Sequence, residues 1–87
     1  MKTYLILTES TPANDKRTIA LAKERFLDGF TVLHGVGHWQ GQSEKSLGIL
    51  VVGSSLAMVQ ALCVNIKLAN RQQTVLVLAW DADVLFI

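Results

Sequence analysis

The sequence predicts a small α+β domain with the element order β-α-β-β-α-β. Two longer segments carry apolar residues every three or four positions, which is the helical spacing. Between and around them lie short runs rich in β-branched and aliphatic residues, one of which alternates with period two, as a half-buried strand does. No linker, internal repeat or low-complexity stretch interrupts the 87 residues, so residues 1–87 are expected to form a single domain.

The first strand and the first helix follow directly from these patterns. An apolar run at residues 4–7 predicts a buried strand of about six residues, which the polar cluster after it ends. A helix is expected from about residue 14 to residue 27, with Gly29 as its C-terminal stop. Its packing face is marked by apolar residues spaced three and four apart, namely Ile19, Ala22 and Phe26.

A β-hairpin is predicted next. Residues 30–38 alternate apolar and small or polar side chains, so this strand is half-buried and presents His34 and His38 on the same side. Residues 47–52 form a continuous apolar run that returns antiparallel to it. The glycine-rich region between the two runs holds more polar residues than a hairpin turn requires.

A second helix and a further strand complete the element order. Ser54 and Ser55 supply the loop and the N-cap of the helix, which ends near residues 69–70. A strand is expected at residues 73–79, and a short extra strand at residues 84–87 closes the chain. The apolar stripe of the second helix comprises Leu56, Val59, Leu62, Cys63 and Ile66.

This order matches the ferredoxin-like arrangement, in which two helices cover one face of a four-stranded antiparallel sheet. The composition bears on the other face. Of all residues 51% are hydrophobic and only 17% are charged, and a domain this small has few charges with which to cover its surface. We therefore expect another subunit to cover the second face of the sheet.

Charge and cysteine content exclude several classes of function. The net charge is +1 and the basic residues are scattered, so no stripe able to neutralise phosphates exists and nucleic acid is not an expected partner. The lone Cys63 excludes an internal disulfide and a cysteine-rich zinc site. The apolar runs are too short to span a bilayer or to serve as a signal peptide, so a soluble cytoplasmic protein without membrane contact is expected.

The candidate site residues lie in and around the predicted hairpin. Glu44 follows the turn, and a carboxylate at a subunit boundary could bind an ammonium or a sulfonium, although a solvated surface glutamate is the alternative. Trp39 could stack on a purine or face a cation, or be an interface aromatic. Gln72 and Gln73 offer amides that both donate and accept, or form a polar loop. His34 and His38 lack a third ligand nearby in sequence, so no metal site is expected.

Four segments together resemble the bacteriophage S-adenosylmethionine lyases, formerly called hydrolases. They are the opening strand YLILT, the GQSEKS segment at 41–46, the VQAL helix segment at 59–62 and the RQQTVLV strand at 71–77. The segment GFTVLHGVGHW, with its GFTV and GxGxW patterns, is also similar to an uncharacterised family of small bacterial domains. That second resemblance implies no activity.

The lyase resemblance implies a homotrimer of ferredoxin-like subunits, arranged like the PII signalling proteins, with active sites in the clefts between subunits and neither cofactor nor metal. The substrate's own carboxylate attacks its γ-carbon and expels 5′-methylthioadenosine, leaving homoserine lactone. Glu44 would be the catalytic residue and hold the substrate's ammonium or sulfonium. A tyrosine of the family would correspond to Tyr4 or be replaced by His34. The substrate-binding residues would be Trp39, Gln40, Gly41, Gln72, Gln73 and His34.

Three functions follow from these observations. The first is cleavage of S-adenosylmethionine, which in a phage would deplete the methyl donor and cofactor used by restriction and modification systems of the bacterial host. The alternative is a non-catalytic PII-like trimer that binds a nucleotide or a small metabolite without turnover. A purely structural oligomerisation module would neither bind nor turn over the ligand.

Overall fold

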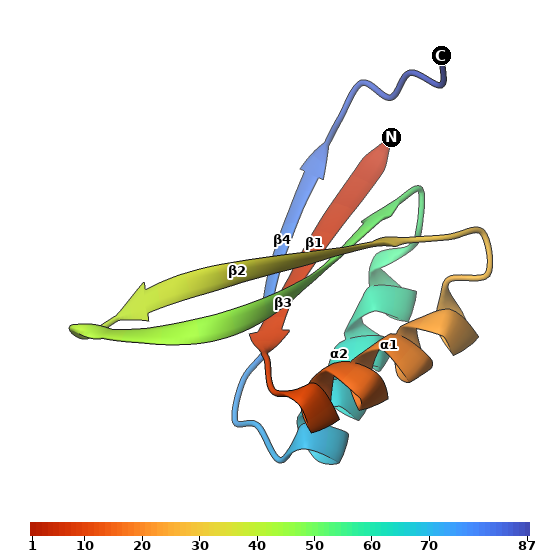
Figure 1. The fold of residues 1–87 in the computed structure, drawn as a ribbon. Helices are drawn as coiled ribbons and strands as arrows, with labels where there is room; N and C mark the ends of the chain where they lie inside the picture. The colour runs from red at the N-terminus through yellow and green to blue at the C-terminus, as the bar shows by residue number, and fades with distance from the viewer.

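The structure is a computed structural model that describes residues 1–87. It has two layers, a four-stranded sheet and a pair of helices packed on one of its faces (Figure 1). The predicted α+β class and element order are confirmed. The elements are β1 (Lys2–Glu9), α1 (Pro12–Arg25), β2 (Thr31–Trp39), β3 (Gln42–Val52), α2 (Leu56–Asn70) and β4 (Leu76–Asp81).

All neighbouring strands run antiparallel, in the order β2-β3-β1-β4. The first strand therefore lies in the middle of the sheet, between β3 and β4. In the register, Ile6 of β1 lies opposite Ile49 of β3 and Val77 of β4. This is the ferredoxin-like topology that the sequence predicts.

The helix boundaries follow from their caps. The hydroxyl of Thr11 accepts a hydrogen bond of 3.0 Å from the backbone N–H of Asn14, and Pro12 occupies the first turn, where its missing N–H is not needed. Helix α1 therefore begins two residues earlier than predicted. It also ends two residues earlier, at Arg25, with Phe26 as its C-cap. Helix α2 is capped by the predicted Ser55, whose hydroxyl accepts from the backbone N–H of Met58.

The strands differ more from prediction than the helices. Strand β3 begins at Gln42 rather than at residue 47, because the hairpin remains paired through the polar segment. Strand β4 begins at Leu76 rather than at residue 73.

The predicted extra strand at residues 84–87 is wrong for the isolated chain. Pairing at this end of the sheet stops at Ala82, which exchanges two backbone hydrogen bonds of 3.0 Å with Met1. The remaining residues leave the sheet as an exposed segment beside the N-terminus (Figure 1), because no free edge of the same chain lies next to them. Leu85 and Phe86 are 81% and 89% exposed.

The core lies between the helices and the face of the sheet that they cover. Residues of this face alternate with residues of the opposite face along each strand. In α2 the predicted stripe is buried except for Leu56, which is half exposed. In α1 the buried face includes the polar side chains of Asn14 and Thr18. The buried apolar residues are Tyr4, Ile6, Ala22, Phe26, Leu47, Ile49, Val51, Val59, Leu62, Cys63 and Ile66.

The opposite face of the sheet, called the open face below, is not covered by any part of the chain. By register it carries the side chains of alternate residues in all four strands. Several of these are large, apolar and more than two fifths exposed, namely Leu33, Val52, Leu76, Leu78 and Trp80. An exposed apolar surface of this kind marks an interaction site. Neither helix is long and apolar enough to cross a membrane.

Candidate functional site

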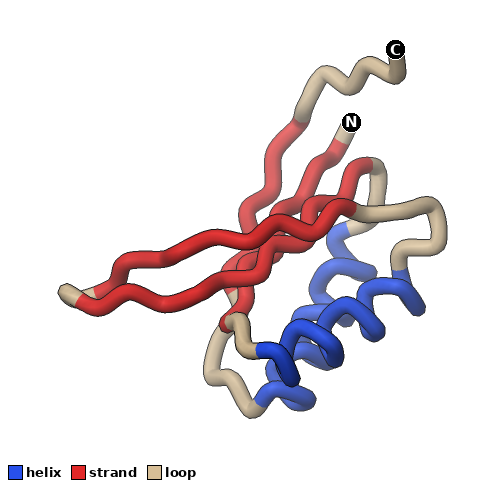
Figure 2. The backbone as a smooth tube through the Cα atoms, in the orientation of Figure 1, coloured by secondary structure: helices blue, strands red, loops and turns tan.

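Strands β2 and β3 extend together beyond the body of the domain as a long arm (Figure 2). The hairpin arm consists of residues 34–46. Its tip is the two-residue turn Gln40-Gly41, with φ angles of 49° and 77°. Positive φ at both central residues defines a type I′ turn, which suits the twist of a two-stranded ribbon. The glycine-rich stretch is therefore mostly paired strand, and Gly41 is its only glycine that lies in the turn.

The two faces of the hairpin arm carry different candidate residues. On the side that faces the helix layer, His34 lies opposite Leu47 and His38 lies opposite Ser43. Both histidines share this side, as predicted. The side continuous with the open face presents Trp39 and Glu44, which lie opposite Gln42 and Gly37 respectively. The tertiary structure thus separates Glu44 from the histidines.

Glu44 is exposed and its carboxylate has no partner within the chain. The one ion pair of the protein joins Lys2 and Asp81 at 3.2 Å, at the far end of the sheet. The residue opposite Glu44 in β2 is Gly37, so no side chain of β2 lies directly across from the carboxylate. Trp39, at the tip, is 71% exposed. A carboxylate and an indole on one face of the arm are therefore both free to contact a ligand or another subunit.

The two predicted glutamines differ in their availability. Gln72 is partly buried in the loop between α2 and β4. Its Oε1 accepts hydrogen bonds from Thr8 Oγ1 at 2.5 Å and from Asn70 Nδ2 at 3.3 Å, and its Nε2 donates to the Thr74 carbonyl oxygen at 3.5 Å. Gln73 is exposed, and its side chain makes no hydrogen bond within the chain. Only the amide of Gln73 is free for a ligand.

Gln72 belongs to a polar network that sequence reasoning missed. Asn70, at the end of α2, donates to Thr18 Oγ1 at 3.0 Å and accepts from Arg17 Nε at 3.0 Å. Arg17 also donates to Asn14 Oδ1 at 2.6 Å. The network joins α1, α2 and the loop that carries the glutamines. The only signal in the sequence is the pair of polar residues at 14 and 18, spaced by one helical turn on the side of α1 that packs.

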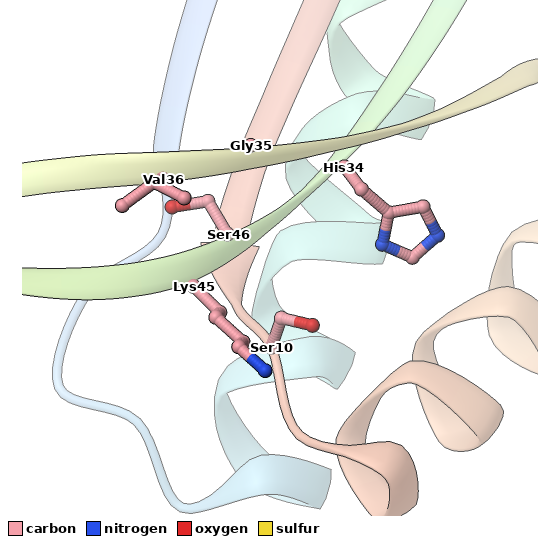
Figure 3. A pocket seen from close by; sticks show the side chains of 6 residues that line it. All are labelled: Ser10, His34, Gly35, Val36, Lys45 and Ser46. Atoms are coloured by element: carbon pink, nitrogen blue, oxygen red, sulfur yellow. The ribbon is translucent and has the colours of Figure 1, made fainter.

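A shallow pocket of about 350 Å³ lies where the hairpin arm leaves the body. In Figure 3 the Lys45 side chain reaches toward Ser10, and the His34 ring points into the gap beside the helices. The Ser10 backbone N–H donates to the Lys45 carbonyl oxygen at 3.0 Å, and its hydroxyl donates to the Asp15 carboxylate at 2.8 Å. The lining residues are Ser10, His34, Gly35, Val36, Lys45 and Ser46.

The predicted residues occupy three separate places in one chain. Trp39, Gln40, Gly41 and Glu44 lie toward the tip of the arm, His34 lies at its base, and Gln72 and Gln73 lie in the loop before β4. Of this set only His34 lines the pocket, whereas Ser10 and Lys45 were not anticipated. Tyr4 is buried in the core at 3% exposure, so its side chain does not reach a ligand at the surface. No group of three or more histidine, cysteine, aspartate or glutamate side chains comes together to hold a metal ion.

No protein-family model matches the chain, and no curated protein matches its sequence. Solved structures do match its fold. A phage SAM lyase in its apo state superposes with a TM-score of 0.68 at 23% identity, covering 91% of this chain and 78% of that one. A DUF3240 family protein from Shewanella baltica gives 0.63 at 15% identity, covering 98% and 97%. The periplasmic divalent cation tolerance protein CutA from Archaeoglobus fulgidus gives 0.62 at 12% identity, covering 99% and 88%. At these identities the likeness establishes a ferredoxin-like, PII-like fold.

Proposed function

We propose that the protein is an S-adenosylmethionine lyase that acts as a homotrimer. The observation that carries the proposal is the unpaired carboxylate of Glu44 on the same face of the sheet as the exposed apolar surface. The fold likeness to a phage SAM lyase over 91% of the chain supports it. The resemblance of residues 41–46 and 71–77 to that family supports it independently.

Assembly would change the surroundings of Glu44. Along β3, Glu44 lies on the same face as Ser46, Gly48 and Leu50 and precedes them, so its side chain lies at the edge of the open face. A second copy that covers the open face would place Glu44 at the rim of the interface. There water is partly excluded, and the lower local dielectric strengthens the attraction between a carboxylate and a ligand cation.

The reaction needs no water, proton donor or cofactor. An oxygen of the substrate's own carboxylate forms a bond to the γ-carbon, and the bond from that carbon to the sulfonium sulfur breaks. The electron pair of the broken bond passes to sulfur, which becomes the neutral thioether of 5′-methylthioadenosine. The other product is homoserine lactone. The protein's task is to fold the substrate into the attacking conformation, and orientation effects of this kind are worth up to about 7 to 11 kcal/mol.

Glu44 fits the substrate's ammonium better than its sulfonium. The sulfonium charge disappears as the carbon–sulfur bond breaks, so a carboxylate beside it would stabilise the substrate more than the transition state. Only interactions that are stronger in the transition state accelerate the chemical step. The ammonium keeps its charge throughout, and a carboxylate that anchors it holds the amino acid part in place while the chain bends.

The remaining contacts would come from the arm and the loop. Trp39 offers an exposed ring for the adenine, and Gln73 offers a free amide. The turn at Gln40 and Gly41 adds backbone groups for the adenine edge. His34 stands in the pocket at the base of the arm. Gln72 would act by holding the loop that presents Gln73. In a phage, this activity would deplete the methyl donor that host restriction and modification systems use.

The first test is incubation of purified protein with S-adenosylmethionine in metal-free buffer, with both products followed by mass spectrometry. The expected result is equal release of methylthioadenosine and homoserine lactone, with the lactone preceding any homoserine. The Glu44→Gln variant is the matched comparison, because it removes the charge of the side chain and keeps its shape. It is expected to release both products more slowly than the unchanged protein. Intact substrate in the presence of stoichiometric assembled protein would overturn the proposal.

A second candidate is a trimer that binds a nucleotide or small metabolite without turnover. The pocket at the base of the arm favours it, since Lys45 and His34 both line a hollow of about 350 Å³. This candidate predicts a rise in melting temperature with an adenine ligand while the ligand stays intact. A structural oligomerisation module predicts neither a shift nor turnover.

A further inference from the structure

Helix α2 is apolar on the side that faces away from the core. Its buried side consists of Val59, Leu62, Cys63 and Ile66. With 3.6 residues per turn, the opposite side of the helix carries a second set, called the outer stripe below. The outer stripe consists of Ala57, Ala61, Val64 and Leu68. Val64 and Leu68 are 55% and 75% exposed, although a surface helix normally carries polar residues on this side.

Helix α1 lies beside α2 in the same layer and has the normal pattern (Figure 2). Its outer side carries Lys16, Lys23 and Glu24, all of them exposed. Helix α2 has a single charged residue, Lys67, which lies beside the outer stripe and not within it. Only α2 therefore presents an uncharged apolar side to solvent. A surface of this kind marks a contact with another macromolecule.

The spacing of the outer stripe favours a helix as its partner. Its members follow one another at intervals of four, three and four residues along α2. This alternation allows two helices to interlock their side chains along their length. The stripe holds no charge that could recognise an acidic or a basic surface. The partner is therefore expected to be a second apolar helix.

A second copy of α2 in the antiparallel orientation complements the stripe in size. About a two-fold axis between Ala61 and Val64, Ala57 of one copy faces Leu68 of the other. By the same symmetry, Ala61 faces Val64. Each larger side chain then meets a small one, which is the condition for close packing between two layers. A parallel pair would set Ala57 against Ala57 and leave a gap at that level.

The charges of α2 also fit the antiparallel pair. In this orientation the two copies of Lys67 would lie about nine residues apart, or about 14 Å along the helices. Salt screens most of the repulsion between exposed charges at that separation. In a parallel pair the two lysines would lie at the same level. The antiparallel pair also sets the positive end of each helix dipole beside the negative end of the other.

We propose that the outer stripe of α2 is an interface at which two copies of this chain pair antiparallel, helix against helix. The contact covers about 22 Å by 10 Å on each copy, well below the roughly 800 Å² per partner of a stable interface. The pairing is therefore weak and depends on protein concentration. It lies on the helix layer, so it leaves the open face of the sheet accessible. The inference goes beyond the proposed function, because it does not depend on a ligand.

The first experiment measures the weight-average molar mass by sedimentation equilibrium between about 1 μM and 1 mM protein. The mass of the unchanged protein is expected to rise to at least twice its value at low concentration. Val64→Glu places a charge in the middle of the contact, so its mass is expected to stay at the low value. A constant mass of the unchanged protein, or a rise that Val64→Glu leaves intact, would overturn the proposal.

The matched control is Ala20→Glu, which introduces the same charge at an exposed site on α1. It is expected to leave the rise in mass intact. Both sites are exposed and glutamate favours helices, so the melting temperature at low concentration should stay the same in both variants. Equal loss of association in the two variants would mean that added charge alone prevents pairing and would overturn the assignment to α2.

Disulfide formation tests the antiparallel geometry. In an Ala57→Cys, Leu68→Cys double variant, mild oxidation at high protein concentration is expected to give a covalent dimer. The two positions are about 16 Å apart along one helix, so they cannot form a disulfide within a chain. Cys63 is buried and does not interfere. Neither single variant should give a dimer. Dimers formed by Ala57→Cys alone would show parallel pairing and would overturn the proposal.

Two other occupants of the outer stripe would give different results. Retention on lipid vesicles that Val64→Glu abolishes, without a rise in mass, would assign the stripe to a membrane surface and overturn the proposal. A rise in mass only after another protein is added would assign it to that protein and overturn the proposal as well. Cleavage of S-adenosylmethionine at low protein concentration should be the same in Val64→Glu. Failure of the lyase proposal therefore leaves the helix pairing intact, and the reverse also holds.

Discussion

Thr8 and Gln72 are joined by a hydrogen bond of 2.5 Å from Oγ1 to Oε1, although 64 residues separate them in sequence. The bond ties the end of the central strand β1 to the loop between α2 and β4. Through Asn70 the same amide oxygen is linked to Thr18 of α1. The exposed Gln73 is therefore held in position by its neighbour rather than by contacts of its own.

Removing this bond is expected to lower the stability of the fold. Thr8 is buried, and Thr8→Val keeps its shape but deletes the hydroxyl donor. We expect the free energy of unfolding to fall by about 1 kcal/mol, because a partly buried amide oxygen loses a partner. Urea denaturation measures the change. Gln73→Ala is the control and should alter stability by less than about 0.5 kcal/mol. Equal effects of the two variants would contradict the assigned roles.

Glu44→Gln is expected to separate activity from folding. The residue is exposed and unpaired, so the melting temperature and the molar mass should not change. If Glu44 anchors the substrate's ammonium, kcat/KM should fall by about tenfold or more, since charged hydrogen bonds are worth about 1.5 to 3 kcal/mol. Glu24→Gln, an exposed substitution on α1, should leave kcat/KM unchanged. Equal turnover by the two variants would remove Glu44 from the site.

The turn at the tip of the arm makes a prediction about stability. Gly41 has a φ of 77°, where other residues are strained, so Gly41→Ala should destabilise the protein by about 1 kcal/mol. Gln40 also has a positive φ, and Gln40→Asn should stabilise it by about 0.5 kcal/mol, since asparagine favours this turn. Thermal unfolding measures both variants. If Gly41→Ala stabilised the protein and Gln40→Asn destabilised it, the turn would have another geometry in solution.

Burial raises the pKa of the Cys63 thiol, because the charged thiolate loses solvation. The thiol therefore binds its proton more tightly in the folded state than in the unfolded state. Below the ordinary pKa of a thiol, Cys63 does not make the free energy of unfolding depend on pH. Above that pKa, the free energy of unfolding falls as pH rises, because the unfolded thiol ionises first. Denaturation of the wild type and of Cys63→Ala between pH 7 and 10.5 measures the difference in slope. A steeper fall in the variant would contradict the assignment.

Local patterns in the sequence were enough to predict most of the fold. The stripe of α2, the alternation of β2 and the apolar run of β3 each reflect burial that repeats with the period of one element. The helix caps at Ser55 and near Pro12 are also local signals. The start of β3 was predicted less well, because residues 42–46 are polar and pair only through the backbone.

The candidate site was predicted less completely. Gln72 and Gln73 are adjacent and chemically identical, so no sequence pattern could tell which amide the fold uses. The separation of Glu44 from His34 depends on the register between β2 and β3, in which neighbouring residues point to opposite faces. The pocket residue Ser10 approaches Lys45 from another part of the chain.

The identity and order of the elements therefore follow from periodicities of a few residues, which each segment carries within itself. The free edge of β2, the apolar open face and the unpaired C-terminal segment appear only when the strands are placed in their order. They are properties of the sheet as a whole, since an edge or a face exists only relative to the strands beside it. That is why the strand predicted at residues 84–87 has no partner within the chain.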